Sequence, residues 1–495
     1  MNRILQFLAF IFLWASFATA QTATVTRNAN LYPHPSSDDE SITKLTKGAE
    51  VRLVEPDSTN RYYHVRTSDG LTGYTYARFL KVQPGSDMSS PPAPSPTPGL
   101  NGGTDTTGAP VPLLAKGHSV DWWFVFKLNS GVFPGCGGTA VQACIFGGEV
   151  QVQKWKSPVS QQFVFASSES PALQQGSNCL GDTTGDPVGA TFEEVYDGSF
   201  SYVVWNDQFY QDPKVAGCGD SCSAPWGHSK GMVAWNDAGE GLVMQVTTPD
   251  WPGAGSKEHP RMQHGNILGC TKDNDIEVSQ HFFALRLKKD DLMKVLTALQ
   301  NASVVTDAKN VQVVKLGGPA DVQALAAHLG VKSGSSSITQ TTLSSGVQLI
   351  SKPSHLNVPP WQMVSVVLGG VSLRTATWWT NPAIDSTTSD TKIDCWDSSL
   401  ANPGAVAIAT TGQWEDKIFG LKGGPSPNSN HAKIGVSTSG DHHFAIFGDM
   451  NQQGSISGKC SSSQNGRGGL FYVIDDATLA NSVQNLIKGD TAPTQ

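Results

Sequence analysis

Apolar residues recur at intervals of three and four within residues 290–301 and 475–489, the spacing of one helical face. Each segment opens with an acidic pair, which suits the positive N-terminal end of a helix dipole. We predict two amphipathic helices, with buried faces formed by Leu292, Val295, Leu296 and Leu299 in the first and by Leu479, Val483, Leu486 and Ile487 in the second. The segment "PADVQALAAHLG", residues 319–330, is predicted to form a further helix.

Short, mostly apolar runs typical of strands precede the first and the last of these helices. They are "GLVMQVTTPDWP" and "HFFALRL" in one case and "HFAIFGDMNQQG" and "GGLFYVI" in the other. A His-x-Lys triplet leads each series, at His228 and Lys230 and again at His431 and Lys433. The repeated order predicts an α/β layered domain built from two halves, residues 113–300 and 301–495, related by a pseudo-two-fold axis.

The N-terminal part of the chain has a different character. Residues 1–20 combine Arg3, an apolar core and a small-residue site at Ala18-Thr19-Ala20, the pattern of a signal peptide, so we expect export. Residues 21–83 alternate short β-like runs with turns and predict a small all-β domain. Residues 84–112 are rich in Pro, Ser, Gly and Thr and predict a linker. No later apolar stretch is long enough to span a bilayer, which predicts a soluble mature protein.

Eight cysteines follow the predicted signal peptide, and an even number in an exported chain favours disulfides. We expect four bridges, Cys136–Cys144, Cys179–Cys270, Cys218–Cys222 and Cys395–Cys460. The alternative for "CGDSC" is half of a zinc site, but no second pair or histidine cluster has matching spacing. The net charge of -8 argues against coating of nucleic acid by bulk electrostatics and leaves room for a local cationic site.

The two His-x-Lys triplets carry the candidate chemistry. If they meet, two imidazoles and two ammonium groups surround one small volume, an array that suits a phosphodiester. One neutral imidazole attacks phosphorus, the protonated one supplies the leaving oxygen with a proton, and no metal or other cofactor is needed. Such a coupled pair predicts a bell-shaped pH profile that favours acid. The competing interpretation places both triplets on unrelated surface strands.

Several motifs in fixed order resemble the deoxyribonuclease II family, a branch of the phospholipase D superfamily. They are "SVDWWFVFKL", "YVVWNDQ", "WGHSKGMVAW", "HAKIGVS", "FGDMNQQGS" and "GRGGLFYV", and the resemblance runs from about residue 118 to 474. It implies a metal-independent DNA endonuclease with two phospholipase D-like halves, a phosphohistidine intermediate and 3′-phosphate products. The catalytic residues that it implies are His228, Lys230, His431, Lys433 and Asn451. Which histidine is the nucleophile stays open, with a slight preference for His228.

Other residues are candidates for supporting roles. Asp250 stands where an amide is expected from the family pattern. It either shifts the pKa of the neighbouring histidine or takes no part in the site. Asp207 and Gln208, with Asn206, either line the site or anchor a turn, and the second role is favoured. Arg467 either contacts a phosphate or decorates a glycine turn. Trp122 and Trp123 are expected in the core or at an interface, because aromatic residues are usually buried and no basic residues are interleaved with them.

Residues 21–83 resemble the bacterial SH3-like family, which implies a β-barrel that binds peptides or cell-wall material, or an inert spacer. The whole chain is therefore predicted to be a secreted or periplasmic nuclease that acts on DNA, as a pseudo-symmetric monomer or as a homodimer. Two alternatives are a phospholipase D-like phosphodiesterase acting on another diester and an inactive wall-binding or adhesive protein.

Overall fold

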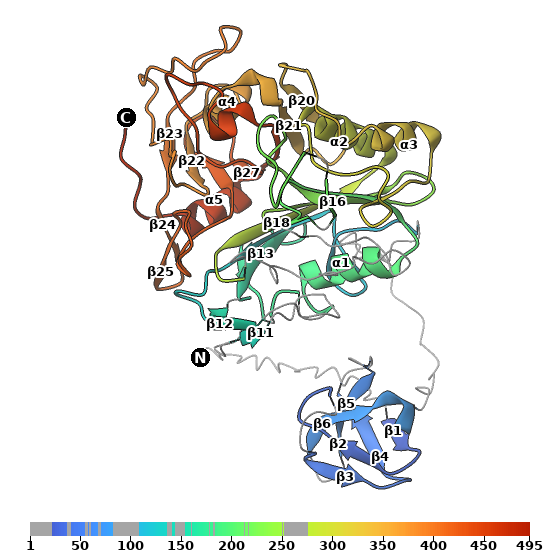
Figure 1. Cartoon of the computed structure of the whole chain (residues 1–495). Coiled ribbons are helices and arrows are strands. Elements are labelled where there is room, and N and C mark those ends of the chain that lie inside the picture. The colour runs from blue at the N-terminus through green and yellow to red at the C-terminus, as the bar shows by residue number, and fades with distance from the viewer. Residues whose placement is uncertain are drawn as a thin grey trace, which may run out of the picture. The chain divides into compact units, whose positions relative to one another are not determined.

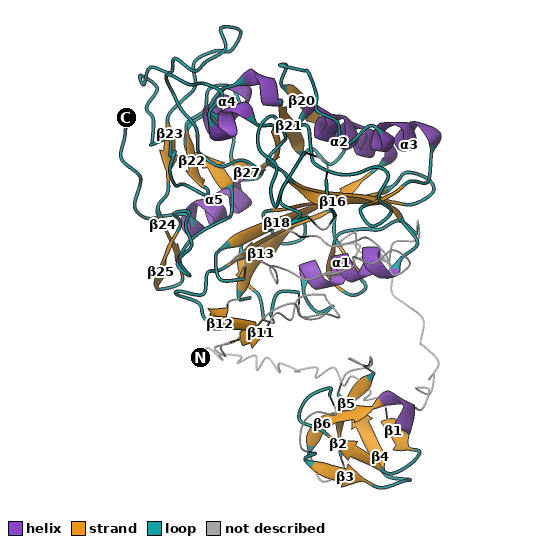
Figure 2. Ribbon diagram, in the orientation of Figure 1, coloured by secondary structure: helices purple, strands orange, loops and turns teal. Residues whose placement is uncertain are grey.

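The computed structural model describes residues 22–36, 41–54, 58, 61–67, 71–82, 108–135, 141–143, 154–159, 161–177, 179–181, 184–211, 213–215, 217–249, 251 and 276–495. The chain divides into two compact units, residues 1–99 and 100–495. Strands dominate the described part of both units, and the few helices are short, as Figure 2 shows.

The first unit is all-β. Five strands form one sheet in the order β6-β5-β4-β1-β7, namely Thr72–Tyr76, Tyr62–Arg66, Glu50–Leu53, Thr22–Val25 and Leu80–Val82. A separate hairpin joins β2 (Ala29–Leu31) to β3 (Thr43–Leu45), and η1 (Ala77–Phe79) is a single 3-10 turn. Every second residue of β1 and β4 is buried, as expected for strands with one face on a core. The core includes Val25, Leu31, Val51 and Val65, so this unit has its own hydrophobic interior.

An eight-stranded sheet organises the first half of the second unit. Its order is β14-β13-β10-β18-β17-β16-β15-β19, namely Gln174–Gln175, Phe163–Ser167, Trp122–Lys127, Gln280–Leu287, Gly241–Val246, Lys230–Trp235, Ser201–Asn206 and Val314–Lys315. Every residue of β10, β15, β16 and β17 is buried. Their near-continuous apolar sequences follow from this, because both faces of the sheet are covered.

A seven-stranded sheet organises the second half. Its order is β20-β21-β28-β27-β26-β22-β23, namely Thr339–Thr342, Gln348–Lys352, Gly469–Asp475, Phe444–Gly448, Ile434–Ser437, Leu373–Ala376 and Val406–Ile408. All pairs are antiparallel apart from β22 with β23. Smaller hairpins are β8–β9 (Leu113–Ala115, His118–Ser119), β11–β12 (Val141–Ala143, Lys154–Val159) and β24–β25 (Thr411–Trp414, Lys417–Gly420).

Aromatic rings join the two sheets into one core. Phe447 of β27 stacks on Phe124 of β10 and on Phe283 of β18, with ring centroids 4.3 and 4.9 Å apart. Tyr472 of β28 lies 5.3 Å from Phe283. The resulting cluster contains residues of both sheets, so the two halves fold around a common interior. Trp122 and Trp123 are buried in this cluster, which confirms their predicted place in the core.

The three predicted helices are confirmed as α2 (Lys289–Asn301), α3 (Ala320–Ala327) and α5 (Ala477–Leu486). All eight apolar residues predicted for the buried faces of α2 and α5 are buried. Helix α2 contacts strands of both sheets, α1 (Pro187–Asp197) contacts β8, and α4 (Pro360–Val367) contacts β23. In Figure 1, α1 and α2 lie on opposite sides of the strands β16 and β18. The predicted α/β class is confirmed.

Two boundaries differ from those expected. Ala109 and Val111, which the sequence assigns to the linker, are buried, and the backbone N–H of Val111 donates to Glu194 Oε2. Strand β19 follows residue 301 but pairs with β15, so the chain returns to the first sheet before it enters the second. Both differences arise because backbone pairing, which composition does not reveal, decides where a packed segment begins.

Two of the four predicted disulfides, Cys218–Cys222 and Cys395–Cys460, are confirmed, with Cα–Cα distances of 4.8 and 5.0 Å. The zinc interpretation of "CGDSC" is therefore wrong. Cys179 is also disulfide-bonded. The other cysteines in the predicted bridges, Cys136, Cys144 and Cys270, lie outside the described residues, as do the predicted signal peptide and most of the linker. No helix in the described ranges is both long enough and apolar enough to cross a bilayer.

Candidate active site

The first His-x-Lys triplet is attached to the second sheet. His228 lies two residues before β16, and its backbone N–H donates to the carbonyl of Gly468, the residue before β28 (2.8 Å). The ring Nδ1 of His228 lies 2.8 Å from the carbonyl oxygen of Asp449, the residue after β27. The segment that leads into β16 of the first sheet is therefore hydrogen-bonded to the second sheet through His228.

The second triplet shows the reciprocal arrangement. The backbone N–H of His431, three residues before β26, donates to the carbonyl of Ser279, the residue before β18 (2.7 Å). The ring Nδ1 of His431 lies 3.2 Å from Nε2 of Gln280. The ring of Trp378 packs against the imidazole with centroids 4.4 Å apart. Each histidine is thus held by the strand ends of the opposite sheet, and one chain brings both triplets together.

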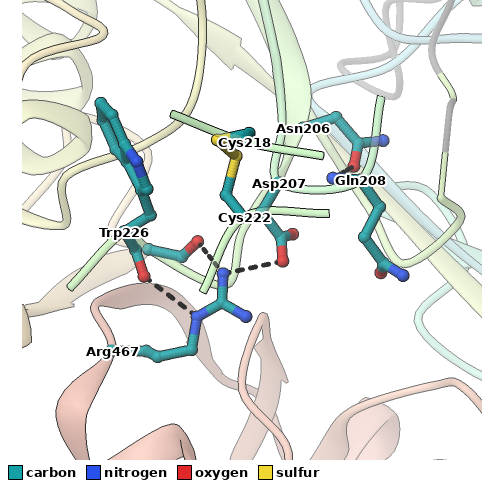
Figure 3. Close-up of a disulfide and its surroundings, with 8 residues drawn as sticks. Asn206, Asp207, Gln208, Cys218, Cys222, Trp226 and Arg467 are labelled. Atoms are coloured by element: carbon teal, nitrogen blue, oxygen red, sulfur yellow. Dashed lines mark hydrogen bonds and ion pairs between the residues drawn. A yellow bond between two sulfur atoms is a disulfide. The ribbon is translucent and has the colours of Figure 1, made fainter. Parts of the chain in front are cut away.

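Asp207 joins the first triplet to the segment before β28. This carboxylate follows β15 and is buried, and it accepts hydrogen bonds from Lys230 Nζ (2.6 Å) and from the Arg467 guanidinium (2.8 Å). Arg467 also donates to the carbonyls of Trp226 and Gly227, immediately before His228 (Figure 3). Burial alone would raise the pKa of Asp207, but the charges of Lys230, His228 and Arg467 outweigh it and hold the pKa well below its usual range.

A buried lysine fixes the segment that carries Arg467. Lys352, at the end of β21, donates from Nζ to the carbonyls of Asn465 (2.8 Å) and Arg467 (2.9 Å). Its burial lowers its pKa to about 7. The residues that hold His228 are therefore themselves tied to the second sheet.

Burial and positive charge favour the neutral form of the site histidines. Burial is the main cause that lowers the pKa of His431, and the charges of Lys433, Lys230 and His228 lower it further. Burial also lowers the pKa of His228, where the charge of Asp207 acts in the opposite direction and those of Lys230, Arg467 and Lys433 add to the lowering. The two triplets therefore lie close enough to affect each other's protonation. Three cations and one carboxylate around two imidazoles form an environment suited to an anion.

A chain of polar side chains links the two triplets behind the histidines. Asp449 accepts from Gln245 Nε2 (3.0 Å) and from the backbone N–H of Leu470 (2.9 Å), and burial raises its pKa to about 7. Oε1 of Gln245 lies 3.4 Å from Nε2 of His281, whose Nδ1 accepts from the backbone N–H of Lys433 (3.1 Å). His281 is fully buried, and burial followed by the charge of Lys433 lowers its pKa.

Comparison with known families identifies the family of the second unit. The sequence model of deoxyribonuclease II matches residues 113–491, which include both sheets and both triplets. The chain belongs to the deoxyribonuclease II family. It is therefore a hydrolase that acts as a deoxyribonuclease, with DNA as its substrate. A search of curated proteins gave no match.

The catalytic residues implied by the resemblance lie in the buried region where the two sheets meet. His228 and His431 are each 8% exposed and Lys230 and Lys433 are 2% and 1% exposed, so they do not lie on open surface strands. The competing surface interpretation of the triplets is wrong for this reason. Asn451 is buried two residues after Asp449, and its Nδ2 donates to Gln453 Oε1 (2.8 Å).

Of the candidate supporting residues of the deoxyribonuclease, Asp207 contacts the site through its side chain, whereas the side chains of Asn206 and Gln208 do not. Asp207 joins the site through Lys230, so a purely local turn role is the wrong interpretation for it. The Asn206 side chain anchors backbone, since Nδ2 donates to the carbonyls of Thr248 (3.2 Å) and Trp251 (2.9 Å). The backbone N–H of Gln208 donates to Asn206 Oδ1 (2.8 Å), and its side chain lies apart from the ion pair between Asp207 and Arg467 in Figure 3. Asp250 lies outside the described residues.

Several residues of the network were not recognised from the sequence as parts of the site. Gln245, Gln280 and His281 have no motif spacing that marks them, because the sheet brings them together. Asp449 lies within the motif "FGDMNQQGS", but nothing in that motif indicates its contact with His228. A polar pair, Gln280 and His281, at the head of the otherwise apolar strand "QHFFALRL" was the available signal. In the described part of the deoxyribonuclease, no three His, Cys, Asp or Glu side chains are grouped as they would be around a metal ion.

Proposed function

We propose that this deoxyribonuclease cleaves DNA without a metal, through a phosphohistidine at His228, and leaves 3′-phosphate ends. One observation carries the proposal: each His-x-Lys triplet is held by the opposite sheet, so that Lys230 and His228 lower the pKa of His431. Two imidazoles that influence each other in this way can act on a single phosphorus.

The hydrogen bond at Nδ1 supports His228 as the nucleophile. A carbonyl oxygen only accepts hydrogen bonds, so the carbonyl of Asp449 requires a proton on Nδ1 of His228. In the neutral imidazole the lone pair then lies on Nε2. Nε2 is the atom that would attack phosphorus.

The partners of His431 favour the opposite tautomer. The hydroxyl of Thr247 accepts from the backbone N–H of His281 (2.9 Å) and lies 2.6 Å from Gln280 Oε1, to which it donates. Gln280 therefore presents its NH2 group to Nδ1 of His431, and the neutral ring carries its proton on Nε2. This makes His431 a poor nucleophile. To act as the general acid, the ring gains a second proton at Nδ1, which requires the Gln280 amide to turn so that Oε1 accepts from Nδ1 while the Thr247 hydroxyl donates to the carbonyl of His281 (3.2 Å).

The reaction then has two displacements. In the first, Nε2 of the neutral His228 imidazole forms a bond to phosphorus, and the bond from phosphorus to the 5′ oxygen breaks. Protonated His431 gives that oxygen its Nε2 proton. In the second, water attacks phosphorus, His431 takes a proton from the water, and the N–P bond breaks with its electron pair returning to His228. The product keeps the phosphate on its 3′ oxygen.

The remaining polar residues have roles in charge stabilisation. Lys230 and Lys433 offset the charge on the non-bridging oxygens, and Asn451 donates a hydrogen bond to one of them. Asp207 fixes the position of Lys230 through an ion pair of 2.6 Å. The Gly231 hydrogen faces the Trp205 ring and the Met244 carbonyl, where a Cβ would come within 2.6 Å of both, so this glycine serves packing of the strand and not approach of substrate.

Strand order supports two phospholipase D-like halves with pseudo-two-fold symmetry. The series β18-β17-β16-β15 followed in the chain by α2 corresponds to β28-β27-β26-β22 followed by α5, and each histidine precedes the third strand of its series. The reciprocal contacts of His228 and His431 follow the same correspondence. We infer that a monomer holds the complete site.

We also propose that the protein is exported and that the first unit is an SH3-like module. The disulfides support export, since they persist in oxidising compartments. The short strands and separate core of the first unit support the module. The resemblance implies a cell-wall or peptide ligand for it.

The test is digestion of supercoiled plasmid in EDTA. Wild type is expected to nick the plasmid, His228→Ala and His431→Ala to be inactive, and His443→Ala, which changes an exposed histidine of the same unit, to retain activity. Product ends should resist extension by a polymerase until a phosphatase has removed the 3′ phosphate. Activity that requires a metal, or products with 3′-hydroxyl ends, would contradict the proposal. Activity only on phospholipid would favour the other diester, and inactivity with wall binding would favour the adhesive alternative.

A further inference from the structure

The first unit contains a ligand-sized cavity of about 370 Å³. It is lined by Arg27, Asn28, Ala29, Asn30, Tyr32, Tyr62, Tyr76, Arg78 and Phe79. Its volume lies within the ~300–1,000 Å³ that is typical of binding sites. Nothing in the proposed nuclease chemistry uses it.

Four aromatic rings form a continuous series along this cavity. Tyr62 lies between Tyr32 and Tyr76, with centroid distances of 6.1 and 5.1 Å, and Phe79 follows Tyr76 at 5.6 Å. The rings come from different parts of the unit, and backbone hydrogen bonds from Thr26 to Phe79 and from Tyr32 to Tyr74 hold those parts together. The series is therefore a built feature of the fold.

Two exposed guanidinium groups complete the lining. Arg27 lies 4.3 Å above the Phe79 ring, and Arg78 lies 5.0 Å from Phe79 and 5.1 Å from Tyr76. A guanidinium group this close to a ring centroid makes a cation–π contact, which favours its place beside the aromatic rings. None of the nine described residues in this lining is Asp or Glu, so the described lining carries two positive charges and no carboxylate.

We propose that this cavity binds a strand of nucleic acid with unpaired bases. Aromatic faces stack with bases, and guanidinium groups contact phosphates, which is the combination that single-stranded nucleic acids require. An acidic peptide would use the arginines but would leave the aromatic part of the lining without a matching partner. The second unit of the same chain cleaves DNA, so nucleic acid is a polymer that this chain meets.

Binding at this cavity raises the local concentration of substrate. Because both units belong to one chain, a strand held by the first unit stays within reach of the nuclease unit. The expected consequence is tighter capture of DNA that has single-stranded ends or gaps.

The experiment measures fluorescence anisotropy of a short fluorescein-labelled oligothymidylate with full-length His228→Ala protein in EDTA. Adding Arg27→Ala and Arg78→Ala is expected to weaken binding by at least about tenfold, the order of magnitude of lost stacking and phosphate contacts. Adding Arg52→Ala and Arg66→Ala removes the same charge from exposed positions of the same unit outside the cavity, and is expected to change binding by less than about twofold. Tyr76→Leu keeps the charge, removes a stacking face, and should also weaken binding.

Four outcomes would overturn the proposal. They are unchanged binding in the Arg27/Arg78 variant, an equal loss in the Arg52/Arg66 control, an equal loss when the probe is a duplex, and wild-type binding in Tyr76→Leu. Displacement of the oligonucleotide by polyglutamate at equal concentration of charge would assign the cavity to acidic peptides instead. Circular dichroism and thermal melting of each variant identify any loss of folding. Since the assay uses an inactive protein, its result is independent of the proposed cleavage mechanism.

Discussion

At the scale of single residues, Asp207 is the carboxylate on which the first triplet depends. It is buried and ionised, and it holds Lys230 and Arg467 at the same time. A buried ion pair is costly to break, because the remaining partner keeps its charge in a poorly solvated place.

We therefore expect Asp207→Asn to lower both stability and activity. Loss of one partner of a buried pair typically costs about 3–5 kcal/mol in free energy of unfolding. Nicking activity should fall by about 10²-fold or more, because Lys230 and the segment before His228 lose their anchor. Chemical denaturation and plasmid nicking measure the two effects, and Asp441→Asn, on an exposed turn, is the matched control. Wild-type stability in Asp207→Asn would show that the pair is unimportant.

Asp449 should make stability depend on pH. Burial raises the pKa of this carboxyl group from 3.8 to about 7, so the folded protein keeps a proton that the unfolded chain releases. Its contribution to stability is complete below pH 3.8 and is lost as the pH rises through about 7. Asp449→Asn lacks this titration, so its free energy of unfolding relative to wild type should rise by about 2–4 kcal/mol between acidic and weakly alkaline pH. A difference that stays constant with pH, measured by urea unfolding, would contradict the assignment.

The sequence indicates the proposed reacting residues but not those that position them. A histidine and a lysine two positions apart can be read directly from the chain at His228 and His431. Their partners are distant in sequence: Asp449 follows β27, and Gln280 begins β18. Only the pairing of the sheets determines which carbonyl or amide meets each ring.

At the scale of elements, the two confirmed disulfides should differ in what they support. Cys395–Cys460 joins residues 65 apart, whereas Cys218–Cys222 joins residues 4 apart. The short one lies beside the site, since the backbone N–H of Cys222 donates to the carbonyl of Asp207 (2.7 Å).

Replacing each pair by serine should separate stability from activity. Chain entropy predicts a loss of about 4 kcal/mol for the long loop and about 2 kcal/mol for the short loop. Activity should fall further in Cys218→Ser/Cys222→Ser, because Asp207 loses a fixed neighbour. Thermal melting and plasmid nicking of the two variants test this, and the same ranking in both assays would count against a special role for the short disulfide.

Helices were predicted more reliably than sheet order. The apolar spacing of α2 and α5 specified their buried faces, including Leu296 and Val483, because helical periodicity is local. The pairing of β10 with β18, or of β19 with β15, depends on contacts between distant segments, and the sequence carried no local sign of it.

At the scale of the whole molecule, the two sheets of the second unit share one aromatic core. The segment that carries each triplet leads into a strand of one sheet and is hydrogen-bonded to the other sheet. Movement of one sheet relative to the other would therefore disturb both histidines at once. This arrangement makes the pH dependence of catalysis a property of the assembled pair.

We expect the rate of plasmid cleavage, measured as kcat/KM, to reach its maximum below pH 6.5. Burial and the charges of Lys433, Lys230 and His228 lower the pKa of His431 below its ordinary value of 6.5, so acid is needed to protonate the general acid. At still lower pH His228 gains a proton and can no longer attack, so the profile falls again. A maximum above pH 8 would be incompatible with these roles.

The central claim is that His228 forms the covalent bond to phosphorus while His431 acts on the leaving oxygen. Thymidine 3′-(4-nitrophenyl phosphate) tests it directly, because nitrophenolate leaves without a proton and the enzyme would keep the thymidine 3′-phosphoryl group. In His431→Ala, which lacks the base for the second step, peptide mass spectrometry of rapidly quenched protein should find that group on His228, and His228→Ala should carry none. A phosphoryl group on His431 of the His228→Ala protein, or no covalent species in either variant, would contradict the account.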